Sequence, residues 1–154
     1  MYMIVLRVYT RLVFRFPAYL FTLWIQSLIL SLEPARTPAA FMPIAEAIAA
    51  VVESDPLPAP WDTDARSAAL LVSIAWFESR FTLDAKDAPG ISCGLWQTAC
   101  PAPKTAEWQA VIAYRLVRQS LELCGDLTFY GSGRCGGAPQ TMRWRELKAL
   151  RLLR

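Results

Sequence analysis

The segment from Phe16 to Leu32 is the feature that most limits what this chain can fold into. Its sequence, FPAYLFTLWIQSLILSL, contains no charged side chain, and Arg7, Arg11 and Arg15 precede it at helical i, i+4 spacing. A helix needs about 17–25 apolar residues to cross a bilayer, and basic flanks stay on its cytoplasmic side. The segment therefore predicts a transmembrane anchor that leaves the rest of the chain outside the cytoplasm. A signal peptide, or a helix packed against other chains of a large assembly, would fit the same pattern.

The rest of the chain is expected to form one mainly α domain with two long irregular loops. Three prolines in residues 33–43 indicate a linker, which separates an N-terminal helix in residues 1–32 from a domain in residues 44–154. Asp62 or Asp64 would cap a helix that runs to about Phe81. Apolar periodicity and turn residues predict helices over about 39–54, 64–81, 105–123 and 139–154.

The absence of histidine and the spacing of the cysteines exclude several classes of site. With no histidine, neither a Ser-His-Asp nor a Cys-His catalytic group can form, and no metal can be bound through imidazole. The four cysteines form no C-x-x-C pair, which argues against zinc and favours disulfides outside the reducing cytosol. Three pairings are open, and short loops favour Cys93–Cys100 with Cys124–Cys135.

The net charge of +3 is unevenly distributed along the chain. Residues 134–154 carry six basic side chains against one acid, Glu146, which gives this part a local charge of +5. Such a tail can contact an anionic surface, whether lipid, nucleic acid or cell-wall polymer, or it can be a solvated helix end. Because no basic run with interleaved aromatic residues is present, a nucleic-acid partner is not expected.

One acid stands on the apolar side of the predicted helix 64–81. Leu71, Ile74, Ala75 and Glu78 share a face at i, i+3, i+4 and i+7 spacing. Burial and the negative end of the helix dipole would both favour the protonated carboxyl, which could then act as a general acid. The alternative is a solvent-facing side chain, or one paired with the nearby Arg80.

Three short motifs give this glutamate a context. ESRF (Glu78–Phe81) is followed by SCGLWQ (Ser92–Gln97) and then by LTFYGSG (Leu127–Gly133). Their order resembles the lytic transglycosylase family of the soluble-lytic-transglycosylase type, related to goose-type lysozyme, with its E-S-x-F, S-x-G-L-x-Q and A-Y-N-x-G motifs. The resemblance covers roughly residues 65–135 and implies a lysozyme-like helical domain.

The resemblance also implies roles for five residues. Glu78 matches the catalytic acid, and Ser92 matches a hydroxyl close to the cleaved sugar. Gly94 matches the place where the backbone approaches the glycan, Gln97 supports the wall of the cleft, and Tyr130 lies beside the catalytic glutamate.

The chain departs from the family pattern at two positions. Gly131 replaces the asparagine of A-Y-N, which puts one hydrogen bond of the cleft in doubt, and Trp96 replaces the commoner methionine. The domain is also short, so that a second lobe closing the groove could be missing or supplied by a partner.

The implied reaction needs a single carboxylate, no metal and no organic cofactor. Glu78 would protonate the glycosidic oxygen between N-acetylmuramic acid and N-acetylglucosamine, and would then take the proton of the muramoyl 6-hydroxyl as a 1,6-anhydro ring closes. A lysozyme-like hydrolysis assisted by Asp84 or Asp87 is the alternative product chemistry, although both aspartates are better explained as turn residues.

The expected partners are peptidoglycan glycan strands and, through residues 1–32, a membrane or other chains of an assembly. The enzyme would open the wall locally, either as a membrane-anchored protein with its domain in the periplasm or outside, or as a phage virion component that assists genome delivery. The second hypothesis is a non-enzymatic membrane or virion protein that keeps a lysozyme-like scaffold.

Overall fold

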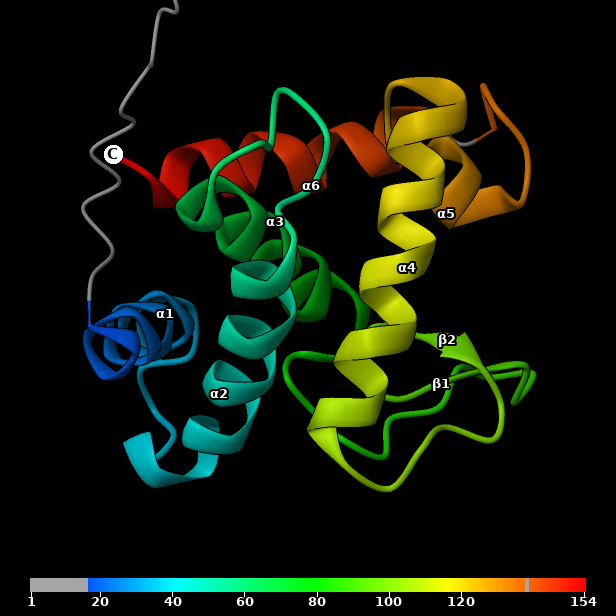
Figure 1. Ribbon diagram of the computed structural model, residues 1–154. Coiled ribbons are helices and arrows are strands. Elements are labelled where there is room, and N and C mark those ends of the chain that lie inside the picture. The colour runs from blue at the N-terminus through cyan, green and yellow to red at the C-terminus, as the bar shows by residue number, and fades with distance from the viewer. Residues whose placement is uncertain (1–16, 138) are drawn as a thin grey trace, which may run out of the picture.

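A computed structural model describes residues 17–137 and 139–154. The described chain is mainly helical, as the sequence predicts (Figure 1). Two antiparallel two-residue strands pair Ser92 with Ala99 and Cys93 with Thr98. In chain order the elements are α1 (Ala18–Leu32), α2 (Pro38–Ser54), α3 (Asp64–Ser79), β1 (Ser92–Cys93), β2 (Thr98–Ala99), α4 (Ala106–Cys124), α5 (Thr128–Ser132) and α6 (Pro139–Leu152).

Helix α3 is the centre of the fold and is packed by α1, α2 and α6 (Figure 1). Every residue from Ser67 to Ala75 is buried, so that this part of α3 has no solvent-facing side. Hydroxyls inside it bind their surroundings: the Ser67 hydroxyl accepts from Leu57 N at 2.9 Å and donates to Trp61 O at 2.7 Å. These two hydrogen bonds hold the loop between α2 and α3 onto the core. Burial on all sides also explains why this part of α3 has apolar residues around its whole circumference.

The N-terminal apolar segment is part of this core. Phe21, Ile25 and Ile29 of α1 are buried, and Gln26 Nε2 donates to Pro38 O at 2.7 Å. Within residues 17–137 and 139–154 no helix has the length and apolarity needed to cross a bilayer, so the transmembrane prediction for 16–32 finds no support there. Packing against α2 and α3 accounts for the lack of charge in α1. Arg7, Arg11 and Arg15 lie outside the described residues.

Two element boundaries differ from the sequence-based expectation. Helix α2 begins at Pro38, so it includes most of the expected linker 33–43; proline suits the first turn because no helical hydrogen bond is lost there. The N-cap of α3 is Thr63, whose hydroxyl accepts from Arg66 N at 3.2 Å, instead of either neighbouring aspartate.

Two disulfides close the two long loops. Cys93 is bonded to Cys100 across the β1–β2 hairpin, and Cys124 at the end of α4 is bonded to Cys135 beyond α5. This is the pairing that the short sequence separations favour. Disulfides of this kind indicate an oxidising environment, either extracellular or periplasmic.

Candidate functional site

The carboxyl end of α3 carries Glu78 and is fixed to the second motif. The helix ends at Arg80, which adopts a left-handed conformation with φ 52°. Ser79, next to Glu78, donates its hydroxyl hydrogen bond to Leu95 O at 2.8 Å. The first motif therefore lies directly against the SCGLWQ segment.

The second motif is itself anchored to the core by two side chains. Trp96 is 1% exposed, and its Nε1 donates to Leu71 O of α3 at 3.0 Å. Gln109 of α4 accepts from Leu95 N at 2.7 Å and donates to Leu83 O at 3.0 Å. Because Gln109 is also buried, one amide ties the loops on both sides of the hairpin together.

Tyr130 brings the third motif to the same place. Its backbone N donates to the buried Ser120 hydroxyl at 2.9 Å, and its phenol donates to Trp96 O. Burial of the phenol raises the pKa of Tyr130 well above its ordinary value, and the negative charge of Glu78 raises it further, while Arg145 acts in the opposite direction. The three motifs thus converge, with Tyr130 close enough to Glu78 to sense its charge.

Glu78 forms an ion pair with Arg145 of α6. Arg145 donates from Nε at 2.9 Å and from Nη2 at 2.6 Å, both to Oε1 of Glu78. The side chains of Glu78 and Arg145 are only 17% and 12% exposed. Arg145 is held in turn by Ser73, whose hydroxyl donates to Arg145 O at 2.6 Å, and its guanidinium lies 5.3 Å from the ring centre of Phe77.

This ion pair changes two expectations about Glu78. The nearby Arg80 is not its partner, since Arg80 binds Glu33 at 3.3 Å and lies over the ring of Trp76. Burial does not leave the carboxyl alone in an apolar setting either, because the guanidinium of Arg145 donates two hydrogen bonds to it. The environment of Glu78 is therefore charged and polar on the side of Oε1.

Two of the three glycines in the motifs, Gly94 and Gly131, are each explained by a packed neighbour. Gly94 has φ +84°, and a Cβ there would lie 2.4 Å from Gln109 Oε1. A Cβ at Gly131 would lie 2.6 Å from Met142 Sδ of α6. Close approach at Gly94 is thus to a protein side chain, and α6 fills the space where the family pattern has an asparagine.

The other candidate residues lie along the hairpin. Ser92 begins β1 and is half-buried. Gln97 Nε2 donates to Gly94 O at 2.9 Å and to Ala85 O at 3.3 Å, so it fixes the turn of the hairpin to the chain that leaves α3. Asp87 accepts from Ile91 N at 2.8 Å, which is a turn role.

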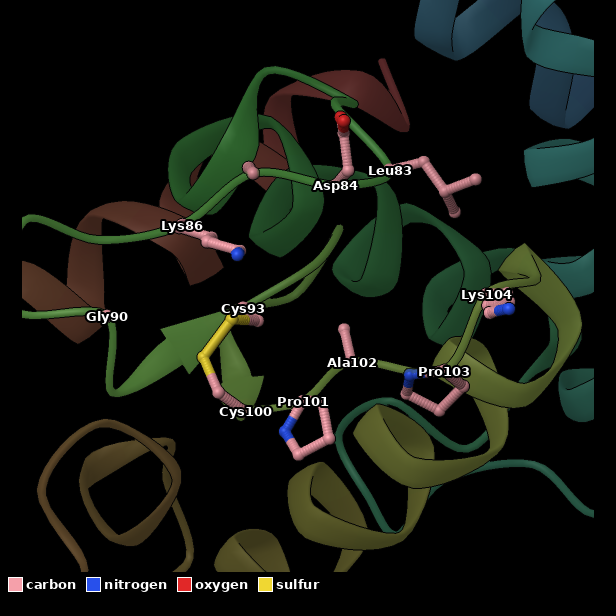
Figure 2. A pocket seen from close by; sticks show the side chains of 11 residues that line it. Leu83, Asp84, Lys86, Gly90, Cys93, Cys100, Pro101, Ala102, Pro103 and Lys104 are labelled. Carbon is pink, nitrogen blue, oxygen red and sulfur yellow. A yellow bond between two sulfur atoms is a disulfide. The ribbon is translucent and has the colours of Figure 1, made fainter.

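A cavity of about 630 Å³ lies beside the hairpin, apart from the ion pair. Figure 2 shows Leu83, Asp84 and Lys86 on one side of this cavity and the 101–104 segment on the other, with the Cys93–Cys100 disulfide between them. Neither Glu78 nor Tyr130 lines it. The cavity therefore belongs to the loop system next to the three motifs, while the converging residues themselves are closely packed.

Several residues that build the site carry no local sequence signal. Arg145 lies 67 positions along the chain from its partner Glu78. Ser73 and Ser120 are serines in the middle of helices, and Gln109 is one of several polar residues of α4. A buried polar residue on an otherwise apolar helix face is the signal that could have indicated Gln109 and both serines. For Arg145 the only indication was the basic character of the C-terminal part.

The fold and the site define a small, mainly helical, disulfide-linked protein with a shielded Glu–Arg pair at the end of its central helix. Comparisons with protein-family models, with curated proteins and with solved structures found no match to this chain. A functional assignment thus depends on the motifs and on the geometry around Glu78.

Proposed function

We propose that this protein is a lytic transglycosylase that cleaves peptidoglycan between N-acetylmuramic acid and N-acetylglucosamine. The observation that supports the proposal is the meeting of three separated motifs: Ser79 binds Leu95 O, Tyr130 binds Trp96 O, and the charge of Glu78 acts on Tyr130. A positioned carboxyl group such as that of Glu78 can give a proton to a glycosidic oxygen.

The ion pair gives the two oxygens of Glu78 different roles. Oε1 accepts both hydrogen bonds from Arg145, whereas Oε2 accepts none from the residues that the structure describes. In the proposed reaction Oε2 first takes up a proton from solvent, and this proton passes to the glycosidic oxygen as the bond to the muramoyl C1 breaks. Arg145 stabilises the negative charge that appears on Glu78 at that moment.

The second half of the reaction uses the same carboxylate. Glu78 takes the proton of the muramoyl 6-hydroxyl, and that oxygen bonds to C1 to close a 1,6-anhydro ring. The released N-acetylglucosamine end carries the first proton, so no water is consumed. Glu78 is protonated again at the end, ready for a second turnover.

The ion pair also supports the competing candidate, a non-enzymatic protein that keeps this scaffold. Oε1 is fully engaged by Arg145, and the cavity beside the hairpin does not include Glu78. In that case the Glu78–Arg145 pair would serve only to hold α6 on α3.

Wall cleavage by matched variants separates the two candidates. Glu78→Gln keeps an oxygen that can accept from Arg145 but carries no transferable proton, so it should remain folded and lose release of soluble fragments from purified sacculi. Glu46→Gln, on the exposed side of α2, should retain wild-type activity. Circular dichroism checks the fold of both variants. Activity retained by folded Glu78→Gln would end the enzymatic proposal.

The setting of this activity is proposed to be local opening of the wall, by a phage virion component during genome delivery or by an envelope protein during assembly of a machine. The disulfides suit both settings, since both lie outside the reducing cytosol. Antibody detection distinguishes the two settings. The protein is a virion component if it is found in purified phage particles, and an envelope protein if it is found in envelope fractions of uninfected cells.

A further inference from the structure

The side of α6 that faces away from α3 carries a row of basic and apolar residues. Arg143, Leu147 and Leu150 follow at i, i+4 and i+7, while Trp144, Leu147 and Arg151 follow at i, i+3 and i+7. These five residues, called here the outer stripe, therefore share one face of the helix. In Figure 1, α6 runs along one side of the group of helices.

The outer stripe is uncovered among the described residues. Trp144 is 57% exposed, Leu147 37% and Leu150 46%, whereas Met142 and Ala149 on the inner side are buried. Large apolar side chains that gather on one helix face, instead of being scattered, mark an interaction surface.

The charge of the outer stripe indicates what kind of surface it contacts. Arg143 and Arg151 are exposed, and so is Arg154, which lies two residues beyond the end of the helix. Glu146, the one acid of α6, lies outside the stripe and is half-buried. The charged residues of the stripe are thus all basic, which favours an anionic partner.

The tryptophan and leucines between the arginines favour a lipid surface over other anionic partners. A nucleic acid or wall polymer would be bound by the arginines, but it would leave Leu147 and Leu150 without an apolar environment. At a bilayer, basic side chains contact the headgroups while tryptophan and leucine enter the boundary with the acyl chains. A bilayer therefore accommodates the apolar and the basic residues of the stripe together.

We propose that α6 docks onto an anionic lipid surface through its outer stripe, lying parallel to the membrane. This contact is peripheral and needs no spanning helix. Arg145 points to the opposite side, toward Glu78, so docking leaves the ion pair in place. The proposal is independent of the reaction proposed above.

Cosedimentation of the full chain with vesicles tests this proposal. Vesicles of phosphatidylcholine with about one third phosphatidylglycerol should bind the protein, vesicles of phosphatidylcholine alone should bind it much less, and added salt should weaken binding. Arg143→Gln with Arg151→Gln should lower the partition coefficient roughly tenfold or more, and Trp144→Ala should lower it severalfold.

Matched surface variants on α4 serve as controls. Trp108 is 62% exposed and Arg115 is also exposed, so Trp108→Ala and Arg115→Gln remove the same side chains away from the stripe and should leave binding unchanged. Equal binding to both kinds of vesicle, equal loss in the α4 variants, or binding to DNA or wall polymer without binding to vesicles would each overturn the proposal.

Discussion

Arg145 donates two hydrogen bonds to a single carboxylate oxygen of Glu78, from Nε at 2.9 Å and from Nη2 at 2.6 Å. Both side chains are nearly buried, and the Ser73 hydroxyl fixes the backbone of Arg145 from α3. The pair joins the last helix of the chain to the carboxyl end of the central one. It therefore orients the candidate catalytic group and holds α6 at the same time.

Removal of Arg145 should be costly for the fold. Arg145→Gln leaves the shielded carboxylate of Glu78 without its guanidinium, and breaking such a pair from one side costs about 3–5 kcal/mol. Urea denaturation with the disulfides intact measures the free energy of unfolding. Arg143→Gln, two positions earlier and exposed, should change it by less than about 0.5 kcal/mol. Similar small effects for both variants would show that the pair contributes little.

Gly94 should tolerate no side chain, because Gln109 occupies the space that a Cβ would need. Gly94→Ala forces a Cβ against Gln109 Oε1, at 2.4 Å, in a residue whose φ is +84°. Gly90 has a φ of +71° but open space around it, so Gly90→Ala pays only the backbone cost of about 1–2 kcal/mol. Thermal unfolding should show a clearly larger loss for Gly94→Ala. Equal losses would mean that the contact with Gln109 is relaxed easily.

The pH dependence of stability should reveal the surroundings of Glu146. Burial, followed by the charge of Asp126, raises the pKa of Glu146 above its ordinary value of 4.5, against a lowering by Arg143. The folded state thus binds this proton more tightly than the unfolded state, and the stability that it provides is lost as the pH rises through the folded pKa.

Replacing Glu146 by a neutral residue tests this pH dependence. Glu146→Gln stays neutral, so its melting temperature should exceed that of the wild type at pH 7, and the difference should vanish below about pH 4. Glu46→Gln, at an exposed position on α2, is the matched control. A Glu146→Gln protein that is less stable at pH 7 would contradict the assignment of an unfavourably buried charge.

The sequence predicts the helices and the disulfides well because local signals determine them. Turn residues delimit α3 and α4, and loops as short as those of Cys93–Cys100 and Cys124–Cys135 can close with little rearrangement. The location of α1 was not predictable in the same way. A charge-free apolar run suits a bilayer and a protein core equally, and its packing against α2 and α3 decides between them.

The candidate site was predicted in part. The motifs indicate Glu78 and Tyr130 because their residue types and order are informative, and the structure brings both to the second motif. Arg145 could not be paired with Glu78 from sequence, since 67 residues separate them and any of several arginines could fill the role. Which long-range partner a carboxylate finds depends on tertiary packing, here on the contact of α6 with α3.

The central claim is that Glu78 alone cleaves the glycan and closes the sugar ring. Its most direct test is mass spectrometry of the soluble fragments that the full-length protein releases from purified sacculi. The wild type should release muropeptides ending in 1,6-anhydro-N-acetylmuramic acid, and Glu78→Gln should release none. Fragments with reducing N-acetylmuramic acid ends, or no fragments from the folded wild-type protein, would contradict it.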